Sequence, residues 1–128
     1  RMMGETVAHT ICKKDTAYQP GIWFNSAKFF DIEYQTYGSV TPELIEGECS
    51  FYWEDSKAEK AVRINYDVQS RAVVGVNTFG IRMRHEVWND WIKAETTIDA
   101  ILPELEKANF DPEFFTHYEK EIAASFSK

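Results

Sequence analysis

Apolar residues recur at helical spacing near the start of the chain. A helix over residues 2–14 would carry one apolar stripe, made of Met3, Val7, Ala8, Ile11 and Cys12. Lys13 and Lys14 would then lie at the negative end of the helix dipole, where cations are favourable. The pattern therefore predicts a helix over 2–14, and Pro20 with Gly21 predicts a loop after it.

An aromatic segment, residues 21–38, follows the loop. From Phe30 onward apolar and polar residues alternate, with Phe30, Ile32 and Tyr34 on one side. This alternation predicts a half-buried strand that begins near Phe30 and turns those three side chains toward the core. The aromatic cluster that leads into it comprises Trp23, Phe24, Phe29 and Phe30. Two interpretations stay open: all four fill the core, or one or two remain at a surface or against a flat ring system.

Three further strands are predicted over 49–54, 61–67 and 72–79. The connections between them are short and polar, as in hairpins, so these strands should pair antiparallel as a meander. With the aromatic segment they give an antiparallel sheet within residues 20–80, predicted to be a meander of about four to five strands.

After residue 84 the period becomes helical, which predicts helices over 84–128. The two apolar stripes there are Val87, Trp88, Trp91 and Ile92, followed by Ile98, Ile101, Leu102 and Leu105. Pro103 either begins a new helical turn or kinks the second segment. Asp111 followed by Pro112 predicts the start of a last helix, with an apolar face of Phe114, Phe115, Tyr118 and Ile122. The predicted fold is α+β, in one domain spanning 1–128.

Composition narrows the classes of function. The 128 residues include 14 Lys and Arg against 21 Asp and Glu, a net charge of −7. This acidity argues against nucleic-acid binding, which needs clustered cations. No apolar run approaches the roughly 20 residues that span a bilayer, and no signal-peptide stretch follows Arg1. We expect a cytoplasmic protein in which Cys12 and Cys49 are reduced thiols, and a piece of a longer protein.

Catalytic and metal-binding patterns are weak. His9 and Cys12 share a helix face, but two ligands fall short of the four that structural zinc takes, so no metal site is predicted. His85 and His117 lie near carboxylates and are expected to be surface or capping residues. The six glycines form no GxGxxG pattern, so this chain alone should not hold FAD or NAD in the usual way. No catalytic residue is predicted.

Five residues of the aromatic segment match a family pattern: Trp23, Phe24, Ser26, Gln35 and Gly38. The segment resembles the opening of the C-terminal domain of FAD-dependent pyridine-nucleotide oxidoreductases of the ferredoxin reductase and rubredoxin reductase type. Residues 73–77 resemble a later strand of that domain, and residues 1–11 are similar to the last helix of the family's FAD domain. Asn25 and the pair 27–28 depart from the pattern, which leaves the redox partner and substrate open.

The resemblance implies a non-catalytic interface domain, with helix 1–14 ending a preceding FAD domain. FAD and NAD(P)H would be held by the FAD- and NAD-binding domains of the same polypeptide. Trp23, Phe24 and Ser26 would lie near the flavin and shape a surface for a small redox protein or for a second subunit in a homodimer. The alternative is a stand-alone module that binds a protein or small ligand or dimerises. A small hydrolase using His85 or His117 is a third, weaker hypothesis.

Overall fold

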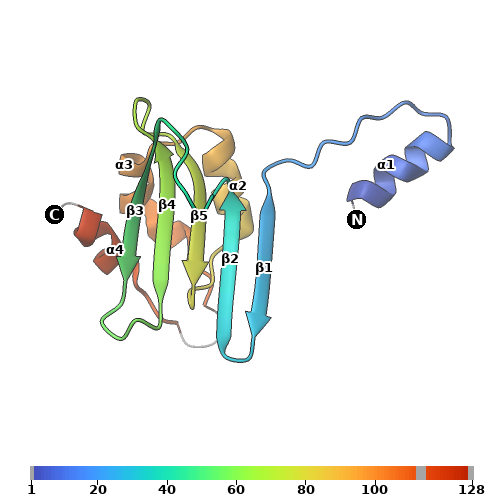
Figure 1. Cartoon of the computed structure of the whole chain (residues 1–128). Helices are drawn as coiled ribbons and strands as arrows, with labels where there is room; N and C mark the ends of the chain where they lie inside the picture. Colours follow the sequence, from blue (N-terminus) through green and yellow to red (C-terminus); the bar gives the residue numbers. More distant parts are fainter. Residues whose placement is uncertain (1, 112–114, 127–128) are drawn as a thin grey trace.

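The computed structural model describes residues 2–111 and 115–126, and these form an α+β fold with an open, five-stranded antiparallel sheet. The first element, α1 (Met2–Ile11), stands apart from the sheet at the end of a long connection (Figure 1). It is shorter than predicted because the chain leaves the helix at Lys13, whose φ is 58°. None of the described helices is long and apolar enough to cross a bilayer.

The strands are β1 (Phe24–Phe29), β2 (Ile32–Gly38), β3 (Glu48–Glu54), β4 (Ala61–Asp67) and β5 (Val73–Phe79). Their order across the sheet is β1-β2-β5-β4-β3, with every neighbouring pair antiparallel. Strands β3 to β5 form a meander joined by short polar turns, but the predicted meander of four to five strands is wrong, because β2 pairs with β5 and not with β3. The hairpin of β1 and β2 is added beside β5, so both β1 and β3 are edge strands.

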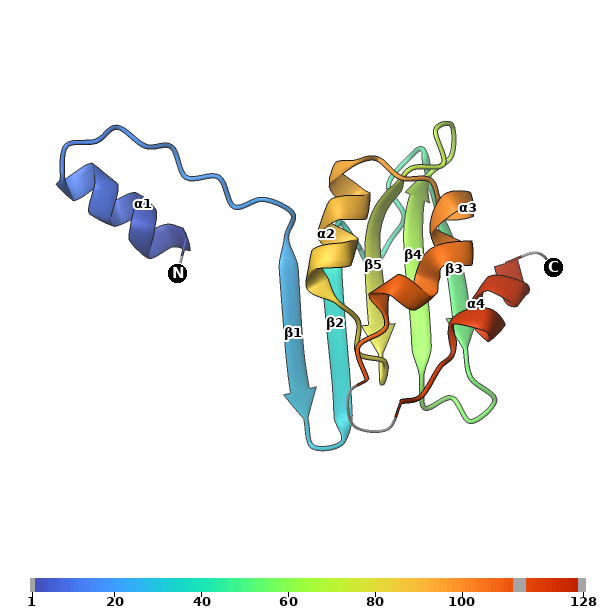
Figure 2. The ribbon, with the colours of Figure 1, turned by 180° about the vertical axis from the view of Figure 1, so that it is seen from behind.

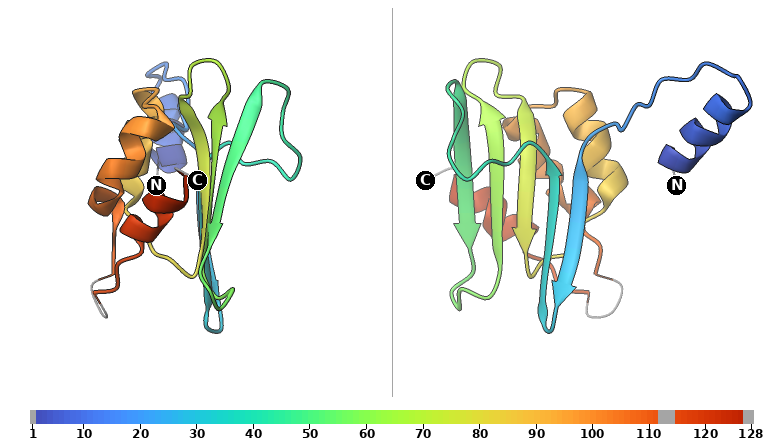
Figure 3. Two further views of the ribbon diagram at one scale, coloured as in Figure 1. Left: turned by 90° about the vertical axis from the view of Figure 1, so that its left-hand side faces the viewer. Right: turned by 45° about the vertical axis from the view of Figure 1, so that its right-hand side comes forward.

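The connection 39–47 has to cross the sheet, because β2 and β3 are not neighbours. It runs over the face opposite the helices (Figure 3). Two glycines permit its close approach. A Cβ on Gly75 would lie 2.2 Å from the carbonyl oxygen of Ser39, and a Cβ on Gly38, whose φ is 69°, would lie 2.2 Å from that of Val74. Close contact of two backbones thus fixes glycine at both positions.

The predicted start of the first strand is wrong. Residues 24–29 are themselves a strand, and Phe30 with Asp31 forms the tight turn of the β1–β2 hairpin. The predicted buried side is also wrong: Gln35 and Tyr37 are buried, whereas Ile32 is exposed. The helices cover the face that carries Gln35 and Tyr37, so the apolar alternation of Ile32 and Tyr34 lies on the open face.

The remaining elements, α2 (His85–Lys93), α3 (Ile98–Ile101), the 3-10 helix η1 (Leu102–Ala108) and α4 (Glu119–Phe126), cover one face of the sheet (Figure 2). Pro103 lies in the first turn of η1, so it begins a new helical segment rather than kinking one. The core lies between this layer and the sheet. Its largest fully buried side chains include Tyr37, Val62, Ile64, Val76, Trp88, Ile98, Ile101, Leu105 and Ile122.

The last helix begins later than predicted. Residues 112–114, including Pro112 and Phe114, lie outside the described part of the chain. Residues 115–118 are not helical, and Phe115 is exposed, with a φ of 53°. The Asp111 carboxylate accepts a hydrogen bond from the Thr116 N–H at 3.0 Å, five residues ahead. Asp111 therefore contacts the segment just ahead of α4, and Ile122 is the buried residue of that helix.

Candidate functional site: the aromatic edge

The predicted site residues all lie on or next to β1. Trp23 immediately precedes the strand, Phe24 is its first residue, and Ser26 lies at its middle. All three are exposed, Trp23 to 58% and Phe24 to 41%. The residues Phe29, Phe30 and Ile32, at the hairpin turn that follows, are exposed too. We call these five apolar residues (Trp23, Phe24, Phe29, Phe30 and Ile32) the aromatic edge. All four members of the aromatic cluster are exposed, so the core interpretation is wrong and more of them lie at the surface than the one or two that the other interpretation expected.

Phe24 connects the aromatic edge to the core through a stack of rings. Its ring centroid lies 4.3 Å from that of His85 and 5.0 Å from that of Tyr37. Tyr37 in turn lies 6.5 Å from Trp88, with near-parallel planes. Trp88 meets Trp91 edge to face at 5.2 Å. Contacts of this kind stabilise beyond the area they bury. Phe24 is therefore held in place, with one side of its ring facing the interior.

His85 is the residue of this site that the sequence did not reveal. It was expected at the surface or as a cap, but it is half-buried and packs between Phe24 and Tyr37. Its Nδ1 is buried without a hydrogen-bond partner in the described part of the chain. No sequence signal marks this role, because β1 and α2 meet only after the sheet has formed.

Beneath the stacked rings, buried polar groups are hydrogen-bonded to one another. The Tyr37 hydroxyl donates to the Met83 carbonyl oxygen at 3.0 Å, and the Met83 N–H donates to Gln35 Oε1 at 2.6 Å. Trp88 Nε1 donates to Met83 Sδ at 3.1 Å. Burial raises the pKa of the Tyr37 phenol, and the carboxylates of Glu86 and Glu33 raise it further. Tyr37 consequently remains a neutral hydrogen-bond donor at physiological pH.

α1 presents a second apolar surface to solvent. Its predicted stripe is present at helical spacing, but Met3, Val7 and Ile11 are exposed by 60%, 56% and 76%. The long connection to β1 makes no backbone hydrogen bond to the sheet before Trp23, within the described residues. A ten-residue helix is marginal in water on its own, because nucleation is costly. The described residues leave the apolar stripe of α1 exposed, so this helix would be stabilised by a further packing surface.

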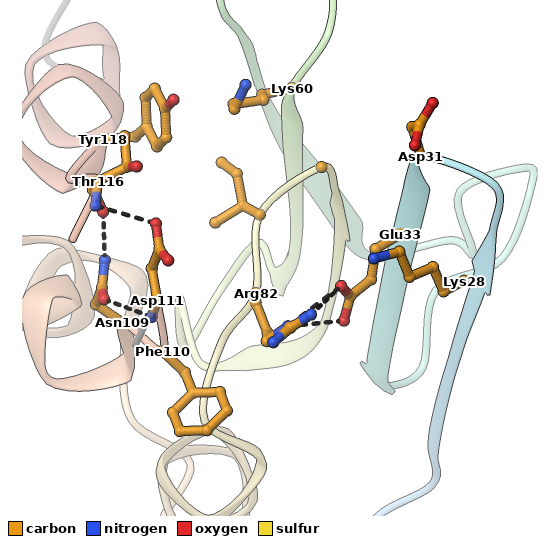
Figure 4. A pocket seen from close by; sticks show the side chains of 12 residues that line it. Lys28, Asp31, Glu33, Lys60, Arg82, Asn109, Phe110, Asp111, Thr116 and Tyr118 are labelled. Carbon is orange, nitrogen blue, oxygen red and sulfur yellow. Dashed lines mark hydrogen bonds and ion pairs between the residues drawn. The ribbon is translucent and has the colours of Figure 1, made fainter. Parts of the chain in front are cut away.

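A polar cavity of about 330 Å³ lies near the start of β2, between the β1–β2 hairpin and residues 109–111, Thr116 and Tyr118 (Figure 4). Glu33 and Arg82 form a bidentate ion pair across part of it, at 2.8–3.2 Å. Lys60 lies over the ring of Tyr118 at 5.4 Å. The charged groups that line it include both signs, and the Asp111 carboxylate accepts a hydrogen bond from the Thr116 N–H. We therefore interpret the cavity as part of the structural contact between the C-terminal segment and the sheet.

The other candidate residues do not assemble into a site. His9 and Cys12 are exposed on or just after α1. No group of three or more His, Cys, Asp or Glu side chains could hold a metal ion within residues 2–111 and 115–126. His117 Nδ1 lies 3.3 Å from Glu119 Oε2 at the start of α4, whereas His85 packs among aromatic rings on another element. The two histidines thus share no catalytic arrangement.

Comparison with known proteins gives no family assignment. No protein-family model matches the chain, and no curated protein matches it significantly.

Proposed function

We propose that this chain is the C-terminal interface domain of an FAD-dependent NAD(P)H oxidoreductase and is not catalytic by itself. In this proposal the FAD- and NAD-binding domains precede it in the same polypeptide. The aromatic edge would pack near the flavin, with Trp23, Phe24 and Ser26 closest to the cofactor. There it would shape a surface for a small redox protein or a second subunit. The free thiols of Cys12 and Cys49 fit a cytoplasmic location.

The observation that carries the proposal is the exposed apolar surface of the N-terminal part of the chain. The exposed side chains Met3, Val7, Ile11, Trp23 and Phe24 all precede residue 25. These side chains lie on two separate elements, α1 and the start of β1, and apolar patches left exposed on a folded domain mark candidate interaction sites. α1 and the start of β1 also lie at the end of the chain to which preceding domains would be joined. This location favours partners in the same polypeptide.

The absence of a glycine-rich phosphate loop from the sequence supports the proposal that other domains bind the nucleotides. A dinucleotide pyrophosphate is usually held by backbone N–H groups at a glycine-rich turn before a helix, and the sequence contains none. Nucleotide binding would therefore belong to the preceding domains, and hydride transfer would be the chemistry of their cofactors.

Substitution of Trp23 tests the proposal in the protein that includes the upstream domains. Trp23→Ala should shift the flavin absorption and fluorescence spectra, because the environment of the isoalloxazine ring changes. The matched control is Tyr52→Ala, which removes an equally exposed ring (58%) on the opposite edge strand and should leave both spectra unchanged. Unchanged spectra for Trp23→Ala, or tight stoichiometric FAD binding by residues 1–128 alone, would refute the proposal.

A stand-alone binding or dimerisation module is the second candidate. The free backbone edge of β1 favours it, since an edge strand can pair with another chain without any cofactor. The upstream reading frame separates the two. A strand followed by GxGxxG supports the flavoenzyme domain, whereas a start codon at Met2 supports the module.

A further inference from the structure

The two edge strands differ in how strongly their charges oppose pairing with another strand. At the β3 edge, four carboxylates lie on or beside the strand, those of Glu46, Glu48, Glu54 and Asp55. Charges of one sign repel a second copy of the same edge. In β1 the one charged residue is Lys28, and no proline interrupts it. For a chain of net charge −7, β1 is the edge with the least repulsion between copies.

The hydrogen-bond pattern shows which backbone groups of β1 face outward. The Gly38 N–H donates to the Trp23 carbonyl oxygen at 2.8 Å, so residues 23 and 38 form a hydrogen-bonded pair. Such pairs alternate along an antiparallel ladder, so Asn25 and Ala27 also bond to β2. The N–H and C=O groups of Phe24, Ser26 and Lys28 consequently point away from the sheet. These groups form a template for one more strand.

We propose that β1 pairs antiparallel with β1 of a second copy of this chain, with Ser26 opposite Ser26, to form a continuous sheet across a two-fold axis. In this register Phe24 lies opposite Lys28 of the second copy, on the helix-covered face. Trp23 lies opposite Phe29 of the second copy on the open face. Each exposed aromatic side chain of β1 thus meets a favourable neighbour, a cation in one case and an aromatic ring in the other.

Three alternative registers each have a defect. Centring the pair on Lys28 places two ammonium groups opposite each other. Centring it on Ala27 requires Phe30 to pair with Phe24, but Phe30 has a φ of 53° and belongs to the hairpin turn, so it cannot extend a ladder. Centring it on Phe24 brings Pro20 into the ladder, where it has no N–H to donate. The Ser26 register avoids all three defects.

The inference does not rest on the flavoenzyme assignment. Pairing through β1 needs no cofactor, because it uses the outward backbone groups of the edge and cross-strand contacts between two copies of the strand. A chain that dimerises through β1 but whose full-length protein binds no flavin would keep this inference and remove the proposed function. A full-length protein that binds flavin but does not dimerise through β1 would keep the proposed function and remove this inference.

Sedimentation velocity of the 128-residue chain over a range of concentrations tests the pairing. We expect a concentration-dependent dimer, and we expect Ser26→Pro to raise its dissociation constant at least ten-fold, because an outward N–H is lost while the β1–β2 bonds remain. The matched control is Tyr52→Pro, which removes an outward N–H from the β3 edge and should leave the dimer intact. A monomer at every concentration would overturn the proposal, as would a dimer that survives Ser26→Pro.

Amide hydrogen exchange of the unmodified chain provides a test that needs no variant. The amides of Phe24, Ser26 and Lys28 should become protected as the concentration rises, whereas those of Ser50 and Tyr52 on the other edge should exchange rapidly throughout. Equal, concentration-independent exchange on the two edges would contradict the pairing.

Discussion

The imidazole ring of His85 lies 4.3 Å from the phenyl ring of Phe24, centroid to centroid, and joins the edge strand β1 to helix α2. β1 has only one neighbouring strand in the chain, so this stack is its main attachment to the helical layer. Phe24 is therefore the member of the aromatic edge that is held in place, so a partner that contacts its ring would order it at little cost in conformational entropy.

Phe24→Ala should loosen β1. Complete burial of a phenylalanine side chain is worth about 3–5 kcal/mol against alanine. Phe24 is 41% exposed, so we expect a loss of about 2 kcal/mol in the free energy of unfolding. Urea denaturation measures it, and the control is Phe30→Ala, because Phe30 is 96% exposed and should change stability by less than about 0.5 kcal/mol. Equal effects of the two substitutions would show that the stack contributes nothing.

Gly75→Ala should destabilise the fold more than its single methyl group suggests. The added Cβ would lie 2.2 Å from the Ser39 carbonyl oxygen, so the backbone of the crossing connection has to move. We expect a cost of about 2–3 kcal/mol, measured by thermal or urea unfolding. Gly4→Ala is the control, since it adds a methyl group in open space on α1 and should not destabilise the chain. A neutral Gly75→Ala would mean that the connection does not lie against β5.

The ion pair of Arg71 and Asp99 should make stability depend on pH in the acid range. Two hydrogen bonds join the side chains, the Nη2–Oδ1 bond at 2.7 Å, and the Arg71 guanidinium lowers the pKa of the Asp99 carboxyl. A lowered pKa in the folded state gives stability that is present above the unfolded pKa of about 3.9 and is lost as pH falls through the folded value.

Asp99→Asn removes this contribution, so the gap in stability between the variant and the parent chain should be largest near neutral pH and shrink below about pH 4. Denaturant unfolding at a series of pH values measures this gap. Asp15→Asn, in the exposed connection after α1, is the control and should run parallel to the parent chain. A gap that does not change with pH would contradict the assigned pair.

The sequence predicted the parts of the fold that local patterns determine. Strands β3, β4 and β5 alternate or are rich in valine and are joined by short polar turns, so their pairing followed directly. The stripe that contains Trp88 likewise predicted α2. The β1–β2 hairpin was missed because its turn begins with Phe30 at a φ of 53°, a conformation usually signalled by glycine or asparagine. The alternation of apolar and polar residues includes the turn residues, so it did not mark the break between the two strands.

Which side of a strand is buried depends on elements far away in the sequence. The helices cover the side of β2 that carries Gln35 and Tyr37, and no local pattern on β2 indicates this. The contact of His85 with Phe24 is equally non-local. For the site, the sequence identified Trp23, Phe24 and Ser26 through a resemblance, and the structure places all three on the exposed edge. Their role beside a flavin stays a prediction.

The most direct test of the central claim is to purify the protein together with the polypeptide encoded upstream and to measure both bound flavin and amide exchange. We predict one FAD per chain, together with protection of α1 and of residues 23–26 relative to the isolated 128 residues. A protein without bound flavin, in which α1 and residues 23–26 exchange as fast as in the isolated chain, would contradict the account.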